Sequence, residues 1–489
     1  MVYSKNDTSL YLCPKDHSTR KEINCLLTVD AMTAMKKKML YFLLLLAALL
    51  PACGTSQMAD SIWQDPAVVS QSNERLSIFY IGENKDSEMM RAALASYKEL
   101  YPDVEVGLIK SDAGASYEAM MELYNQTAAQ IMTGEGPDVF IINDEVMDVE
   151  KLVRQGIFAD MDPFFQADHF DWEPYNQTIM NGGVWNGKRF VIPLSYTFPL
   201  LITSQAALDD TGFDVNACKD FKGFLEETMR FLEDPAQTRR LFYGTSSVLS
   251  EESECFGIPI IDYDARGVDL SSPLLQPMLQ WRKTLLEKDP KRIYDITGGL
   301  GGAAAIRDGQ ALWTNTILGP LYGFYYDFGA LKTLGDAVMM PIRDVNGGIQ
   351  AKLQYCVAVR GNSENLQNAY NYIKLLLSPH IQHAINRQVL SVLNSANDYF
   401  YQKAARGDTH FAMAGTDQFT STVESYYATD CPTLDEYQQL VSFAQEITGT
   451  YYGSHSDLYN LMRPFLLEGV DYEETLKITQ HTLEIYITE

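Results

Sequence analysis

AQIMTGEGPDVFII, residues 129–142, joins a helical pattern to a strand pattern and decides the fold class. Its first residues end a helix that carries Met120, Leu123 and Ile131 on one face. The glycines and proline of residues 134–137 force a tight turn. Residues 138–142 then have the pattern of a buried strand. The stretch therefore predicts a helix that feeds directly into a central strand of a sheet.

The preceding residues repeat this alternation. Residues 76–81 and 104–108 have strand patterns, and Met90, Ala93 and Tyr97 mark one face of a helix between them. The order βαβαβ is typical of a parallel, doubly wound sheet, so the fold class is α/β.

Later elements are predicted with the same rules. A helix is expected around residues 149–155, ended by Gly156, and a strand at 189–192, closed by Pro193. Residues 205–310 are mainly helical, strands return at 337–340 and 355–359, and the C-terminal third is helical, with a long last helix from about Tyr472.

The charge balance excludes one class of partner. The chain has 38 Lys and Arg against 64 Asp and Glu, a net charge of −26. Such a surface repels phosphate backbones and anionic lipid headgroups, so we expect no nucleic-acid partner.

The N-terminus has the pattern of a targeting signal. Three lysines at 36–38 precede an uncharged apolar run of 11 residues, Leu40 to Leu50, which is too short to span a bilayer. The following LPACG, residues 50–54, resembles a bacterial lipoprotein box with Cys53 as the lipidated residue. An ordinary secretory signal that contains a cysteine is the alternative. We therefore assign 1–34 to an over-called start, 35–52 to the signal peptide and 53–74 to a tether.

Motifs for catalysis and for metals are weak. The sequence lacks G-x-S-x-G, H-E-x-x-H and P-loop patterns. Only His380 and His383 stand close enough to share a metal, and no Cys or carboxylate cluster flanks them. Asp262–Gly267 begins like a calcium loop, but Pro273 stands where the bidentate acid belongs, so an acidic turn is predicted. We expect no catalytic residue, no metal and no cofactor.

A set of segments in a fixed order resembles bacterial extracellular solute-binding proteins of family 1, the sugar-type receptors of ABC importers. The glycine turn at 129–140 is similar to the ASG-x-GPD-V segment of that family. The other similar segments are 156–161, 186–193, 306–313, 367–378 and 469–489. The set covers about residues 76–489.

The resemblance implies a two-lobe, type II periplasmic-binding-protein-like fold. Each lobe is then a mostly parallel sheet flanked by helices, with a hinge of crossing strands. We expect the N-lobe at 75–195 plus 312–354 and the C-lobe at 196–311 plus 355–489. The crossings would lie near Ser195–Phe198, Leu312 and Gln354–Cys356.

The same resemblance points to ligand contacts in the crevice between the lobes. Sugars need flat aromatic groups and polar side chains that exchange hydrogen bonds. In place of the Tyr-Tyr-Asn strand of many relatives, residues 199–204 read PLLITS, so the ligand can differ too. The candidates follow the first strand, the glycine turn and two crossings: Glu83, Asn84, Lys85, Glu135, Tyr196, Thr197, Trp313, Asn315 and Tyr322.

These features predict a monomeric, lipid-anchored receptor on the outer face of the cytoplasmic membrane. It would bind a carbohydrate, hand it to an ABC permease and have no catalytic activity. The open alternatives are a receptor for a peptide, polyamine or other solute, a receptor that feeds a sensor, and a surface glycan-processing enzyme that uses paired carboxylates. Four scattered cysteines are expected to be buried thiols, with at most one bridge: Cys218, Cys255, Cys356 and Cys431.

Overall fold

The computed structural model describes most of the chain after the predicted tether. Ser61–Glu489 form one compact unit, to which all described elements belong. The predicted start, signal peptide, tether and Cys53 lie outside the described residues, as do Glu83, Asn84, Lys85, Tyr322 and Cys431. The described ranges are 75–80, 87–110, 117–143, 147–243, 253–288, 302–315, 324–332, 335–383, 389–406, 432–453 and 458–488.

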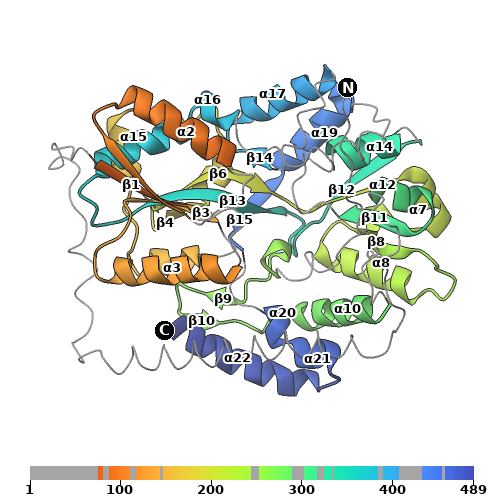
Figure 1. Ribbon diagram of the computed structural model, residues 1–489. Coiled ribbons are helices and arrows are strands. Elements are labelled where there is room, and N and C mark those ends of the chain that lie inside the picture. Colours follow the sequence, from red (N-terminus) through yellow and green to blue (C-terminus); the bar gives the residue numbers. More distant parts are fainter. Residues whose placement is uncertain are drawn as a thin grey trace, which may run out of the picture. The chain divides into compact units, whose positions relative to one another are not determined.

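The first sheet begins with the predicted βαβαβ unit. Strand β1 (Arg75–Tyr80) pairs in parallel with β2 (Glu105–Lys110) and with β3 (Val139–Asn143). Helices α2 (Ser87–Leu100) and α3 (Tyr117–Met132) connect these strands. In Figure 1, α2 and α15 (Leu366–Leu377) lie over one face of this sheet and α3 lies over the other. The predicted parallel arrangement of the first three strands is confirmed.

The rest of the first sheet contains strands of both directions. The long strand β13 (Ile349–Val359) runs between β3 and β6 (Val191–Thr197) and is antiparallel to both. Two further strands complete the sheet, β14 (Leu390–Ser391) on β6 and β15 (Ile447–Tyr451) on β13. The sheet is therefore mixed, because segments from three distant parts of the chain enter it.

Strand β6 is longer than its sequence pattern predicts. Pro193 was expected to close it, but the strand continues to Thr197, and Pro193 lies opposite Cys356 of β13. The register between β6 and β13 shifts at Tyr355/Cys356, beside this pair. A proline lacks the N–H that a regular ladder requires, and a local irregularity in the pairing accommodates it.

The second sheet has four strands in the order β12–β7–β11–β8. They are β12 (Ala337–Pro341), β7 (Leu200–Ser204), β11 (Ala311–Asn315) and β8 (Arg240–Tyr243). Among the described residues, the helices that pack with this sheet to form the second lobe include α7 (Gln205–Thr211), α8 (Phe221–Glu233), α10 (Leu275–Lys288), α12 (Gly302–Arg307) and α14 (Gly329–Lys332).

The division of the chain between the two sheets differs from the predicted one. The first crossing is where it was expected, because β6 ends at Thr197 in the first sheet and β7 starts at Leu200 in the second. The predicted return near Leu312 is wrong, since β11 pairs with β7 and β8. The chain returns instead over residues 342–348, between β12 and β13. Residues 355–377 consequently belong to the first lobe.

The described C-terminal elements pack on both lobes. α16 (Pro379–Gln382) and α17 (Asn394–Ala405) follow α15 in the first lobe. α19 (Leu434–Gln445) leads into β15, and α20 (Leu458–Leu461), α21 (Arg463–Leu467) and α22 (Tyr472–Thr488) follow, with α21 against α10. In the parts of the chain that the structure describes, no helix is both long and apolar enough to cross a bilayer. The buried cysteines there are Cys218, Cys255 and Cys356.

Candidate ligand-binding site

A pocket of about 310 Å³ lies where segments of the two lobes meet. The first lobe contributes Asp148 and Glu150, directly after β3, and Gln350 of β13. The second lobe contributes the segment from Glu254 to Tyr263. The remaining lining comes from the 342–348 crossing and from β15 with the residues after it: Asp344, Asn346, Thr450, Tyr451, Tyr452 and Gly453.

The chain places Asp148 and Glu150 at the edge where ligands of α/β proteins bind. β3 ends at Asn143, and α4 (Val149–Arg154) begins a few residues later. Asp148 is the N-cap of α4, and its Oδ1 accepts a hydrogen bond of 3.0 Å from the Lys151 amide. The carboxyl ends of parallel strands form the usual ligand crevice, so these two carboxylates lie at the favoured edge.

The crossing turn forms a rigid wall of the pocket. The Asp344 carboxylate accepts hydrogen bonds from the amides of Asn346 (2.8 Å) and Gly348 (2.9 Å) and from Nε2 of Gln350 (2.5 Å). The backbone amide of Val345 donates to the carbonyl of Phe256 in the second lobe. The acceptor atoms of Asp344 are thus already used, and this residue shapes the pocket.

Three tyrosines supply aromatic surface to the pocket. Tyr263 and Tyr451 are half-buried, whereas Tyr452 is mostly buried. The Tyr452 hydroxyl donates to the Gly182 carbonyl at 3.1 Å, and its ring stacks on Trp185 with centroids 5.8 Å apart. Tyr452 is therefore fixed in the first lobe, whereas Tyr263 and Tyr451 are partly exposed.

The electrostatics of the pocket are one-sided. Four carboxylates line it, those of Asp148, Glu150, Glu254 and Asp344, and none of the described lining residues is Lys, Arg or His. Burial, reinforced by the nearby Asp148 carboxylate, raises the pKa of Glu150 to about 7, although Arg154 opposes the shift. Glu150 thus carries a proton over part of the physiological pH range. Within the described ranges, no three or more His, Cys, Asp or Glu side chains are placed so that they could hold a metal ion, and this includes the four pocket carboxylates.

Replacing Glu150 with Gln should flatten the pH dependence of stability. The folded protein keeps a proton on Glu150 that the unfolded chain releases above about pH 4.5, so the wild-type free energy of unfolding falls as pH rises from 4.5 to 7. Glu150→Gln removes this decrease in stability. The free energy of unfolding of the variant minus that of wild type should therefore be about 1–3 kcal/mol larger at pH 8 than at pH 4.5. Urea unfolding at both pH values measures it. Glu99→Gln, on the exposed side of α2, is the control, and an equal change in both variants would contradict the assignment.

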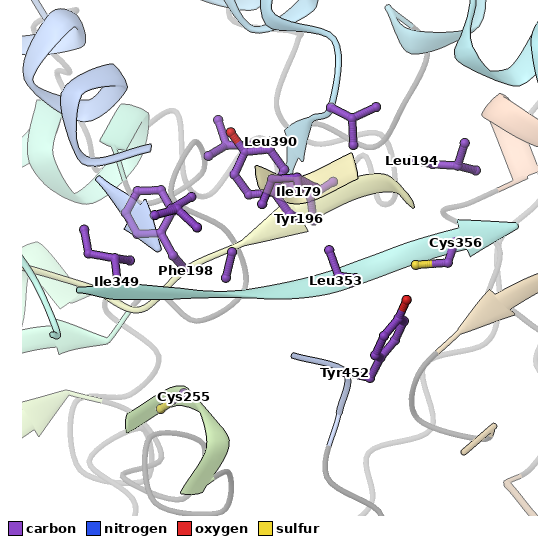
Figure 2. Close-up of a cluster of buried hydrophobic side chains, with 14 of the residues drawn as sticks. Ile179, Leu194, Tyr196, Phe198, Cys255, Ile349, Leu353, Cys356, Leu390 and Tyr452 are labelled. Atoms are coloured by element: carbon purple, nitrogen blue, oxygen red, sulfur yellow. The ribbon is translucent and has the colours of Figure 1, made fainter. Parts of the chain in front are cut away.

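Three of the sequence candidates lie in the core. Tyr196, Thr197 and Trp313 expose 1 %, 2 % and 0 % of their surface. Figure 2 shows Tyr196 among apolar side chains on one side of β13, near Leu353 and Leu390, with Tyr452 on the other side. Burial raises the pKa of the Tyr196 hydroxyl to about 12. None of the three lines the described pocket, so their role as ligand contacts stays a prediction.

The glycine turn lies at the other edge of the sheet from the pocket. Glu135 is exposed and precedes β3, whereas the pocket residues follow it. The expectation that this turn faces the crevice is wrong, because β1, β2 and β3 are parallel and their carboxyl ends point away from it. Asp138 of the same turn is buried and holds Ser77 and Ser363 by hydrogen bonds. Asn315 ends β11 in the second sheet.

The sequence patterns gave no functional signal for most residues of this pocket. Asp148 precedes a short helix and Asp344 lies in an ordinary turn, so each is typical of a cap or a turn. Tyr263 drew attention only as part of the calcium-like segment, which forms a hairpin between β9 (Ile261–Asp262) and β10 (Gly267–Val268). These residues have in common only that the folded chain brings them to the same pocket, and that proximity is set by the topology of the fold.

Comparisons with known proteins agree with this architecture. Residues 82–238 match the sequence model of the bacterial extracellular solute-binding protein family. No curated protein sequence matches the chain.

Solved structures resemble the chain at low sequence identity, and the structural match extends over nearly the whole length of each of them. A putative oligosaccharide periplasmic-binding protein from Synechococcus sp. MITs9220 is 12% identical, with a TM-score of 0.56 over 84% of this chain and 99% of that one. The GacH receptor of Streptomyces glaucescens GLA.O, solved unliganded and with acarbose, is 12% identical, with a TM-score of 0.50 over 85% and 98%. A substrate-binding protein of Listeria monocytogenes in complex with cycloalternan is 12% identical, with a TM-score of 0.50 over 85% and 99%.

These matches establish the fold as the two-lobe architecture of periplasmic binding proteins, and the matched family and structures are binding proteins. The resemblance to bacterial extracellular solute-binding proteins that the sequence motifs predict is therefore confirmed.

Proposed function

We propose that this protein is a lipid-anchored receptor that binds an oligosaccharide between its two lobes and delivers it to an ABC permease. The observation that carries the proposal is the pocket at the lobe junction, where tyrosine rings stand beside carboxylates and amides. Sugar recognition uses this combination, because aromatic rings cover the C–H faces while polar groups bind the hydroxyls. The similar structures solved with acarbose and cycloalternan support the substrate class.

The anchor and the transport partner belong to the same proposal. Cys53 follows a basic and apolar segment of the length of a signal peptide, and the matched family is extracellular. Lipidation at Cys53 would hold the two lobes at the outer face of the cytoplasmic membrane, where permease subunits are within reach. The predicted contacts Glu83, Asn84, Lys85, Asn315 and Tyr322 stay part of the proposal, beside the pocket residues, whereas Glu135 does not, because it lies at the other edge of the sheet.

The test is the melting temperature of the full chain with a panel of oligosaccharides, polyamines and peptides. A ligand at 100 times its Kd adds about 2.7 kcal/mol to the free energy of unfolding. This stabilisation raises the melting temperature by a measurable amount. We expect one oligosaccharide class to give this shift and Tyr451→Ala to abolish it. Tyr399→Ala, a half-buried tyrosine of α17 outside the pocket, is the matched control and should keep the shift.

A second candidate is a receptor for a cationic solute such as a polyamine. Four carboxylates without a basic residue in the described lining favour a positively charged ligand. Spermidine would then raise the melting temperature, this increase would become smaller at high salt, and sugars would have no effect. That result would mean that the solute is a cation and not a carbohydrate.

An alternative from another class of protein is an enzyme that cleaves a glycan. Incubation with the bound oligosaccharide, followed by mass spectrometry, should return the intact ligand. Accumulation of shorter products, abolished by Glu150→Gln, would overturn the receptor proposal.

A further inference from the structure

Helix α4 presents one face of charged groups to the second lobe. Asp148, Lys151 and Arg154 are three residues apart, so they lie along one side of this short helix. Val149 and Val153 are buried against the core. The polar side of α4 is thus available for contacts across the junction between the lobes.

Each of these three side chains contacts a residue from a segment that packs with the second lobe. Tyr263 of the β9–β10 hairpin donates its hydroxyl hydrogen to Asp148 Oδ2 at 2.8 Å, and the hydroxyl of Tyr486, in α22, donates to the same oxygen. Lys151 Nζ donates to the Tyr486 carbonyl at 3.0 Å and lies 4.3 Å from the centre of its ring. Arg154 forms an ion pair with Asp264, next to Tyr263.

The two sides of this contact are connected to different lobes. The segment after α4 is bound to the end of β13, because the Gly361 amide donates to the Ile157 carbonyl at 2.7 Å. The β9–β10 hairpin contacts α22, α22 contacts α20 and α21, and α21 packs on α10 of the second lobe. Asp148 is therefore the point at which two segments of the second lobe are bonded to the first.

The chemistry favours a strong contact at this point. Asp148 is 8 % exposed, and a carboxylate that accepts two hydroxyl hydrogen bonds forms charge-assisted bonds. Burial, with the Asp148 charge as the next cause, raises the pKa of Tyr263 and of Tyr486 well above the ordinary value. Both hydroxyls therefore stay protonated and remain donors at physiological pH.

We propose that Asp148, Tyr263 and Tyr486 form a latch that holds the two lobes together and sets how readily the pocket opens. Asp148 and Tyr263 also line the pocket, so an entering solute meets the latch directly. The role in ligand exchange rests on the proposed receptor function, whereas the latch itself is a property of the ligand-free protein. A ligand group that donates to Asp148 would compete with a tyrosine and couple binding to movement of the lobes.

The experiment is amide hydrogen exchange of the ligand-free full chain carrying Tyr263→Phe and Tyr486→Phe together. Both substitutions keep the rings and remove only the hydroxyls. We expect exchange in α4 and in the β9–β10 hairpin to become at least about tenfold faster, since two charge-assisted bonds are lost. The radius of gyration from X-ray scattering should rise as well.

The matched control is Tyr370→Phe. The Tyr370 hydroxyl donates to Asp168 Oδ2 at 2.8 Å, and both residues belong to the first lobe. This variant loses a tyrosine–carboxylate bond of the same kind and should leave exchange in α4 and the hairpin unchanged. Asp148→Asn is the second test, because asparagine keeps the helix cap but removes the charge, and it should also accelerate exchange in both segments.

Two results would overturn the latch: unchanged exchange in the double variant, or equal acceleration in Tyr370→Phe. A ligand identified with the melting panel adds a separate readout, and its dissociation rate should increase in the double variant. Absence of any ligand would overturn the receptor function while the exchange result still decides the latch.

Discussion

Asp138→Ala should lower the free energy of unfolding by about 3–5 kcal/mol, because it removes a buried carboxylate on which two segments of the first lobe converge. Asp138 is 4 % exposed and accepts hydrogen bonds from the Ser77 amide (2.8 Å) and hydroxyl (2.7 Å). It also accepts from the Ser363 hydroxyl (2.6 Å) and Asn365 Nδ2 (3.1 Å), with Arg360 at 3.6 Å. Alanine leaves these donors without their acceptor and Arg360 without its counter-charge.

Urea unfolding of the full chain measures this effect. Asp103→Ala, at an exposed position between α2 and β2, is the control and should change stability by less than about 0.5 kcal/mol. Asp138→Asn should cost less than Asp138→Ala, since the amide oxygen can still accept. If Asp138→Ala lowers the free energy of unfolding by less than about 1 kcal/mol, the hydrogen bonds of Asp138 in the glycine turn do not stabilise the first lobe as we expect.

Trp313→Ala should have an effect of similar size in the second lobe, about 3–5 kcal/mol. Trp313 is fully buried in β11, and its ring meets Phe213 edge to face, with centroids 5.5 Å apart and an angle of 77°. Alanine would leave a large cavity beside the sheet, because close-packed neighbours relax only in part.

The conservative variant Trp313→Phe separates a core role from a ligand-binding role. If Trp313 is a core residue, Trp313→Phe costs less than Trp313→Ala and keeps the melting shift that the ligand induces. If it is a ligand platform, Trp313→Phe loses much of that shift with little change in stability. Tyr451→Ala serves as the reference for lost binding, and Tyr399→Ala as the reference for retained binding.

Local elements of the fold follow from the sequence because their signals are local. The apolar spacing that predicts a helix around Met90 and Tyr97 corresponds to α2, and residues 138–142 correspond to β3. The division of the chain between the two lobes cannot be predicted from local sequence signals. β11 and β13 have similar apolar compositions, and only their long-range partners, β7 and β8 for one and β3 and β6 for the other, decide the sheet to which each belongs.

The site was harder to predict than the fold for the same reason. Trp313 and Tyr196 are the residue types that a sugar platform requires, but both strands are covered on both faces, so their aromatic rings fill the core. Asp148 and Tyr263 are 115 positions apart and are joined by a hydrogen bond. Sequence spacing contains no sign of that pair.

The position of β13 has a consequence for the order in which the protein can fold. β13 is the strand that joins β3 to β6, and it follows β3 by roughly 200 residues, or about 10 to 40 s of synthesis at common ribosome rates. Until then the exposed edges of β3 and β6 have no partner in the growing chain. The first lobe is thus completed after the second sheet has been synthesised, and its high contact order favours slow folding. If the chain is exported as proposed, slow folding would keep it unfolded for longer before it reaches an export channel.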